Sequence, residues 1–146
     1  MSNKPVINAL RRALADTYAL QVKAQNYHWN VTGPDFYGLH KLFEEQYDDA
    51  AGAVDELAER IRALGDKAPG SFKAFQQLTG VSDPVDGAGP ETMIADLQAS
   101  HETVSKELGE GIQAAEQAED PVTADLFTER RAAHDKHAWM LRSHLA

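Results

Sequence analysis

The chain has 146 residues, enough for one domain with its own hydrophobic core. It contains no cysteine, which excludes disulfides and thiolate metal sites. Any metal site must therefore use His, Asp and Glu, ligands that suit iron, manganese or zinc. The net charge of -9 at pH 7 disfavours nucleic acid as a partner, because phosphate binding needs clustered Lys and Arg.

No apolar run is long enough for a membrane span, and the polar segment Met1 to Pro5 is not followed by a signal-peptide core. We therefore expect a cytoplasmic protein without a membrane partner. Apolar residues at helical spacing predict a first helix from Lys4 to Asn30, ended by Gly33 and Pro34. The same pattern predicts a second helix from Asp35 to Leu64, which Gly65 terminates.

A long connection follows, from Asp66 to Gly89, in which only residues 71–78 can form a short helix. A third helix is expected to begin near Pro90, and a fourth to begin with Asp120 as its cap and run to about Leu145. The predicted fold class is all-α. It is a ferritin-like four-helix bundle with a short extra helix in the long crossover between helices two and three, and residues 1–146 form one domain. A generic four-helix bundle has the same periodicity, so this pattern indicates fold class alone.

The second predicted helix carries an acidic stretch without Lys or Arg between residues 44 and 59. Such a run is usually a solvated face. Here, however, a helical rotation of about 100° per residue places four side chains on a face separate from the apolar row. These side chains are His40, Glu44, Asp55 and Glu59.

The four side chains cannot converge on one metal within one chain, because Glu44 and Asp55 are about 16 Å apart along the helix axis. They form two half-sites instead, His40 with Glu44 and Asp55 with Glu59, each an i, i+4 pair. If two copies of the helix pack antiparallel, the early half-site of one faces the late half-site of the other. Ala51 lies on this face near the midpoint and permits close approach.

His28, at the end of the first helix, lies close in sequence to the start of the second helix and is a candidate ligand beside His40. Either histidine alone is better interpreted as a half-buried, hydrogen-bonded residue. Together with the carboxylate pairs they favour metal binding. The Glu-x-x-His motif of intra-bundle di-iron proteins is absent, because no His is preceded by Glu three positions earlier.

Several motifs together resemble the Dps family, the mini-ferritins named as DNA-binding proteins from starved cells. They are His28-Trp29-Asn30, Gly33-Pro34-x-Phe36, Leu39-His40, Asp55-x-x-x-Glu59-Arg60 and Ala138-Trp139-Met140-Leu141-Arg142. The resemblance implies a homo-dodecamer built from two-fold dimers. It implies dinuclear iron sites at the dimer interface, with His28, His40 and Glu44 from one subunit and Asp55 and Glu59 from its partner. Many members carry Asp at the position of Glu44, and Trp29 would lie next to the site.

The implied activity is that of a ferroxidase, which oxidises ferrous iron with hydrogen peroxide in preference to oxygen. The ferric mineral would be stored in a hollow cage, which protects the cell from oxidative damage. The resemblance also implies an acidic pore from Asp120, Asp125 and Glu129. For Asp125 and Glu129 a solvated face is an equally good interpretation, whereas helix capping is the favoured role of Asp120.

Two alternatives remain. One is a non-catalytic shell, or a nucleoid-associated interaction protein, with an impaired iron site. The other is a monomeric bundle whose acidic face is merely solvated. Direct DNA binding is not expected, because the segment before the first helix has one Lys and the chain ends directly after the fourth helix. Hydrogen-bonded or surface roles are expected for His101, His134, His137 and His144, and a secondary metal site at His134 and His137 is the weaker alternative. Trp139 and Met140 are expected in the core or an interface.

Overall fold

The computed structural model describes residues 3–146; Met1 and Ser2, part of the N-terminal segment with one Lys, lie outside it. The helices are α1 (Lys4–Asn30), α2 (Phe36–Ala63), α3 (Phe72–Leu78), α4 (Pro90–Gln117) and α5 (Pro121–Leu145). Residues 3–146 contain no strand. The all-α prediction is confirmed, including the short helix in the crossover.

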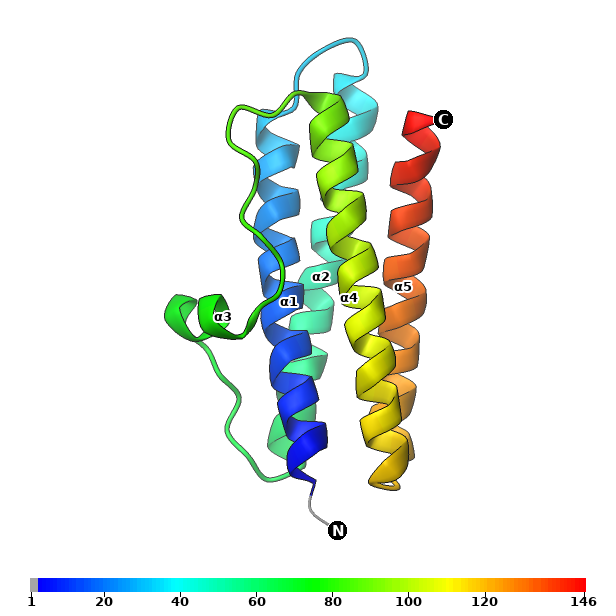
Figure 1. Ribbon diagram of the computed structural model, residues 1–146. Helices are drawn as coiled ribbons and strands as arrows, with labels where there is room; N and C mark the ends of the chain where they lie inside the picture. Colours follow the sequence, from blue (N-terminus) through cyan, green and yellow to red (C-terminus); the bar gives the residue numbers. More distant parts are fainter. Residues whose placement is uncertain (1–2) are drawn as a thin grey trace.

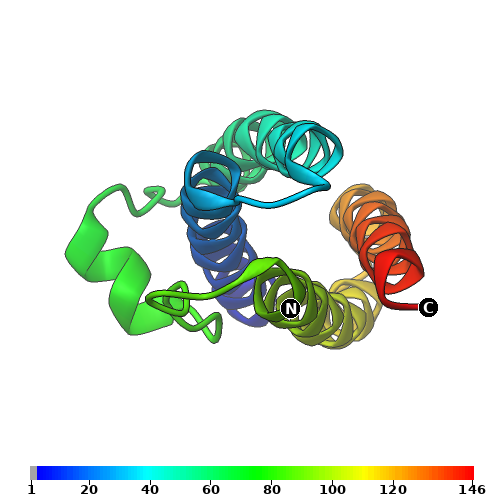
Figure 2. The same cartoon turned by 90° about the horizontal axis from the view of Figure 1, so that it is seen from above.

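The four long helices form an upright bundle in which α1 and α2 run in opposite directions (Figure 1). The crossover then returns along the length of the bundle, so α4 starts at the same end as α2 and α5 runs back (Figure 1). Seen from above, α3 lies outside the four-helix bundle, beside α1 (Figure 2). Helix α1 packs closely on both α2 and α4, whereas α2 and α5 approach each other much less.

Local signals in the sequence explain where the helices end. Gly33 and Gly65 follow α1 and α2 with φ values of +109° and +97°, in the left-handed region that favours glycine. The side chain of Asp120 accepts a hydrogen bond from the backbone N–H of Thr123 at 3.0 Å, which confirms its predicted role as the cap of α5.

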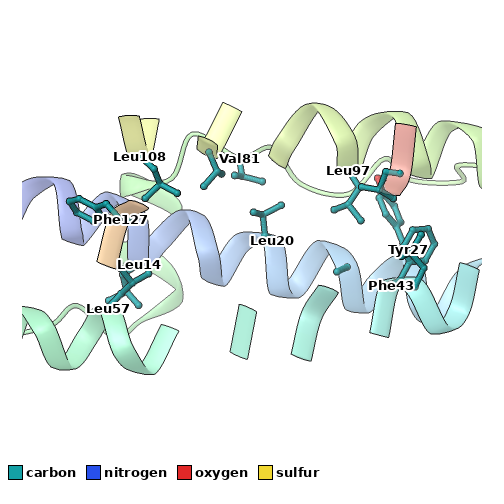
Figure 3. Packing of buried hydrophobic residues seen from close by; sticks show 14 of the residues in the cluster. Leu14, Leu20, Tyr27, Phe43, Leu57, Val81, Leu97, Leu108 and Phe127 are labelled. Carbon is teal, nitrogen blue, oxygen red and sulfur yellow. The ribbon is translucent and has the colours of Figure 1, made fainter. Parts of the chain in front are cut away.

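The hydrophobic core extends along the whole bundle, from Leu14, Leu57 and Phe127 at one end to Tyr27 and Phe43 at the other (Figure 3). Val22 of α1, an apolar residue four positions after Tyr18 and eight after Leu14, is nevertheless 44% exposed. Residues four apart drift by about 40° around a helix, so a long i+4 row leaves the buried face.

A polar network crosses the bundle interior. His101 and His134 are both buried, and their Nδ1 atoms are 2.9 Å apart. His101 Nε2 donates to Gln46 Oε1 at 2.9 Å, so in a neutral His101 ring Nδ1 is the acceptor and His134 Nδ1 carries the shared hydrogen. The expected hydrogen-bonded roles of these two histidines are confirmed.

The network continues to the α2–α5 side of the bundle. Arg130 holds both oxygens of Asp49, at 3.1 Å and 2.8 Å, and His137 Nε2 binds Asp49 Oδ2 at 3.0 Å. Burial raises the pKa of Asp49, but hydrogen bonds from His137 and Arg130 outweigh it and hold that pKa well below its ordinary value. His137 is therefore engaged by a carboxylate. Its ring lies 6.3 Å from that of His134, which disfavours the secondary metal site considered for this pair.

Two further expectations concern the surface. Trp139 is 55% exposed, so it does not belong to the core of a single chain, whereas Met140 packs partly buried against that core.

Among residues 3–146, no helix is both long enough and apolar enough to cross a lipid bilayer.

Candidate metal centre

The centre of the candidate site is a pair of histidines where α1 ends and α2 begins. His28 Nδ1 lies 2.7 Å from the backbone oxygen of His40, and His40 Nδ1 lies 2.7 Å from the backbone oxygen of His28. The two rings stack with centroids 3.7 Å apart and planes inclined by 13°. The short turn after α1 thus brings together two residues that are twelve positions apart in sequence.

This reciprocal arrangement fixes the tautomer of both rings. A backbone carbonyl oxygen can only accept, so each Nδ1 must donate its hydrogen. In the neutral ring Nε2 then carries a free lone pair, which is the form that binds a metal. Hydrogen bonds of this kind commonly orient histidine ligands in metal sites.

Aromatic neighbours hold the two imidazoles in place. Phe36 stacks on His40 with a centroid distance of 4.9 Å, and Tyr47 meets His28 edge-on at 5.2 Å. His28 is buried, whereas His40 is only partly so. Trp29, the predicted neighbour of the site, is 68% exposed and directs its ring to the outside of this chain.

Glu44 lies next to the histidines, as its position one turn after His40 predicts. Its Oε1 is 3.9 Å from His28 Nε2, and its Oε2 is 3.7 Å from the ammonium group of Lys41. The early half-site of this chain therefore contains two imidazoles and one carboxylate. Lys41, which the sequence analysis did not single out, is a cation beside the same carboxylate.

The late half-site is an exposed carboxyl pair further along α2. A hydrogen bond with Asp55, followed by the charge of Asp55, raises the pKa of Glu59. The two carboxyl groups therefore converge closely enough to share a proton, as their i, i+4 spacing predicts. Two carboxyl groups this close together on an exposed helix face are suited to bind a cation between them.

Two small residues lie on the exposed side of α2 between the two half-sites. Ala51 and Gly52 are exposed, and no heavy atom lies within 4 Å of a Cβ built on Gly52. A shallow hollow next to Asp55 is bordered by Ala51 and by Pro69, Gly70 and Phe75 of the crossover. Within residues 3–146, no group of three or more His, Asp and Glu side chains is arranged to hold a metal ion in one chain.

The predicted pore residues occupy different environments. Both carboxylate oxygens of Asp120 are engaged, Oδ1 by Arg60 at 3.1 Å and Oδ2 by the hydroxyl group of Thr123. Burial raises the pKa of Asp120, but its bonds to Thr123 and Arg60 outweigh it and keep that pKa low. Asp125 and Glu129 are exposed, and Asp125 borders an open hollow with Glu116 and Glu119.

Comparisons with known proteins agree with this architecture. A model of the ferritin-like domain matches residues 7–146. The chain is 37% identical over 143 residues to DNA protection during starvation protein 2 of Bacillus anthracis, which covers 98% of each chain. It is 32% identical over 143 residues to general stress protein 20U of Bacillus subtilis, covering 98% of this chain and 99% of that one.

Solved structures give the same result. Dps from Staphylococcus aureus matches with a TM-score of 0.96 and 36% identity, covering 100% of this chain and 99% of that one. The Dps protein from Vibrio cholerae O1, described as a member of a broad superfamily of ferritin-like diiron-carboxylate proteins, matches with a TM-score of 0.92 and 28% identity, covering 97% and 89%. By sequence and by fold, this chain belongs to the Dps family of ferritin-like proteins.

Proposed function

We propose that this protein is a mini-ferritin that oxidises ferrous iron at dinuclear sites shared between two subunits. The observation that carries the proposal is the reciprocal bonding of His28 and His40, which leaves two Nε2 lone pairs free beside Glu44. Family membership supports the broader iron-handling role, because the Dps relative from Vibrio cholerae O1 is placed among diiron-carboxylate proteins.

The stacked rings favour two ions over one. A nitrogen lone pair lies in the plane of its ring, and these two planes are nearly parallel, with centroids 3.7 Å apart. Lone pairs in parallel planes do not meet at a point, so each imidazole binds its own ion. Two-metal sites in enzymes hold their ions about 3.5–4 Å apart, which matches this stacking distance.

A second subunit supplies the carboxylates that each ion still lacks. An antiparallel contact through Ala51 brings Asp55 and Glu59 of the partner subunit opposite His28, His40 and Glu44. Two identical sites result from one two-fold axis. The exposed state of Asp55 and Glu59 in the isolated chain is consistent with this role.

Each protein group then has a defined part in the reaction. The imidazoles and carboxylates bind two ferrous ions and stabilise the added positive charge as both become ferric. The two ferrous ions release one electron each. Together with two protons from solvent, these electrons convert one hydrogen peroxide molecule into two water molecules. Because the electrons leave as a pair from adjacent ions, no hydroxyl radical is released. We further propose that the ferric product is stored in a dodecameric cage.

Asp125 and Glu129 are proposed as part of an acidic entrance for ferrous ions, since exposed carboxylates that gather around a pore attract cations. Asp120 is left out of this entrance because Arg60 and Thr123 already engage its oxygens.

The test is ferrous oxidation followed optically, with peroxide and with oxygen as separate oxidants. The double variant His28→Ala, His40→Ala should lose at least about tenfold in rate with either oxidant, because the residues that bind the metal control both its affinity and the rate. His144→Ala, an exposed histidine at the end of α5, is the matched control and should retain the wild-type rate.

Because His28 is buried, its substitution can also impair folding. A second double variant, at exposed residues, separates loss of the site from loss of the fold. Asp55→Asn with Glu59→Gln changes two exposed side chains and should show the same loss. Wild-type rates in both double variants would remove the ferroxidase assignment.

A further inference from the structure

A second pair of carboxyl groups lies far from the histidines, beneath the end of the crossover. Asp16 of α1 is 1% exposed, and its Oδ1 accepts hydrogen bonds from Thr79 Oγ1 at 2.7 Å and from the backbone N–H of Gly80 at 2.8 Å. Glu107 of α4 lines the same cavity as Asp16, close enough for a hydrogen bond between the two carboxyl groups. Asp16 Oδ2 and Glu107 Oε2 are both buried without an N–H or O–H donor from elsewhere in residues 3–146.

Two ionised carboxylates cannot form a hydrogen bond with each other, so a bond between these two groups requires a proton. Because Asp16 Oδ1 already accepts from Thr79 and Gly80, we assign that proton to Glu107. In agreement, the hydrogen bond with Asp16, followed by burial, raises the pKa of Glu107 to about 7, against a lowering by the charge of Arg12.

The crossover is packed tightly on this pair. A Cβ placed on Gly80 would lie 2.9 Å from Glu107 Oε1, so the backbone of Gly80 touches the carboxyl group directly. We propose that Asp16 and Glu107 form a proton-dependent clamp that fastens Thr79 and Gly80 to α1 and α4, and that loss of the shared proton loosens the crossover.

Nearby charged groups affect the pH at which the clamp opens. Arg12 of α1 and Glu110 of α4 line the same cavity of about 170 Å³ as the carboxyl pair, and α5 contributes Phe127. The cavity gives the proton a route to solvent. The folded-state pKa of Glu107 is raised, so the clamp is complete in acid and weakens as pH rises through about 7.

Loosening of the crossover would change the surroundings of Asp55 in the candidate metal centre. Pro69, Gly70 and Phe75 of the same crossover border the hollow beside Asp55 and Ala51. The clamp therefore connects pH to the face on which the partner subunit is proposed to dock. This last link rests on the proposed function, whereas the clamp itself does not involve iron.

The direct test is hydrogen exchange of the metal-free protein, measured by mass spectrometry on peptides that contain Gly80 and corrected for the intrinsic pH dependence of exchange. The Gly80 amide reports the clamp because it donates to Asp16. Its protection factor should fall at least about tenfold between about pH 6 and pH 8.5. In Glu107→Gln, which donates to Asp16 without titrating, it should change less than about twofold.

Glu110→Gln is the matched control, since it removes a carboxylate from the same cavity without breaking the pair. It should behave like wild type. Infrared spectroscopy supplies the second readout: a protonated carboxyl C=O band present near pH 6 should be absent from Glu107→Gln and retained in Glu110→Gln. Equal pH dependence in wild type and Glu107→Gln, or no protonated carboxyl band in the wild type, would overturn the clamp, whatever the iron assays show.

Discussion

At the scale of single residues, the chemistry of each histidine follows from which ring nitrogen the surroundings occupy. His28 and His40 give Nδ1 to backbone carbonyls and keep Nε2 for a ligand. His101 and His134 instead bond to each other inside the bundle, and His134 Nε2 is buried with no partner among residues 3–146. The same residue type thus has two roles, and the sequence distinguishes them only through neighbouring carboxylates.

The buried histidine pair makes folding sensitive to acid. Burial lowers the pKa of His134 to about 3, whereas an unfolded chain protonates near the ordinary value of 6.5. Between these values the unfolded state binds the extra proton, so stability falls as pH decreases from about 6.5. We expect a loss of about 3 kcal/mol between neutral pH and pH 4.

Thermal melting as a function of pH checks this expectation. His134→Leu should be less stable at neutral pH by about 1–3 kcal/mol, because His101 loses its hydrogen-bond donor. It should nevertheless show a flatter decline toward pH 4 than the wild type. The control His144→Leu changes an exposed histidine and should follow the wild-type curve. Parallel curves for wild type and His134→Leu would contradict the assignment.

Single residues also show what the sequence could and could not predict. The angular positions of Glu44, Asp55 and Glu59 follow from helix geometry alone. The structure places Glu44 3.9 Å from His28 and brings Asp55 and Glu59 together. The pairing of Asp16 with Glu107 joins residues on different helices through the crossover. Such contacts depend on tertiary packing, for which one sequence carries no local signal.

At the scale of elements, α2 contributes most of the candidate site. One side of this helix supplies core residues such as Leu57 and Ile61, and a separate side supplies the ligands. The ends of α1 and α2 and the start of α5 were predictable to within a residue because Gly33, Gly65 and Pro121 act locally. The polar interior was not predictable, since Gln46 and Asp49 on α2 meet their partners only after α4 and α5 have packed.

The exposed middle of α2 gives a test of the proposed helix contact. Ala51→Arg places a long charged side chain at the centre of the antiparallel pair and should prevent close approach. Analytical ultracentrifugation should then show species smaller than the wild-type assembly, together with at least about tenfold slower ferrous oxidation. Ala63→Arg, exposed at the last position of the same helix, is the control. An unchanged assembly in Ala51→Arg would place the two-fold contact elsewhere.

At the scale of the whole molecule, the order and lengths of the helices were sufficient to predict a ferritin-like bundle, and comparison places the chain in the Dps family. The assembly is a different matter, because a single chain carries only complementary halves of the proposed site. Geometry within α2 predicts that a partner is needed. That geometry does not determine how many dimers form the assembly. Only the family resemblance implies a dodecamer.

Complementation between two defective subunits tests this central claim most directly. One variant, His28→Ala with His40→Ala, lacks the early half-site, and the other, Asp55→Asn with Glu59→Gln, lacks the late one. After joint unfolding and reassembly in equal amounts, half of the dimers are mixed, and each mixed dimer regains one of its two sites. Ferrous oxidation should therefore recover to about a quarter of the wild-type rate. A mixture no faster than either variant alone, with mixed assemblies verified by mass spectrometry, would contradict a site shared between subunits.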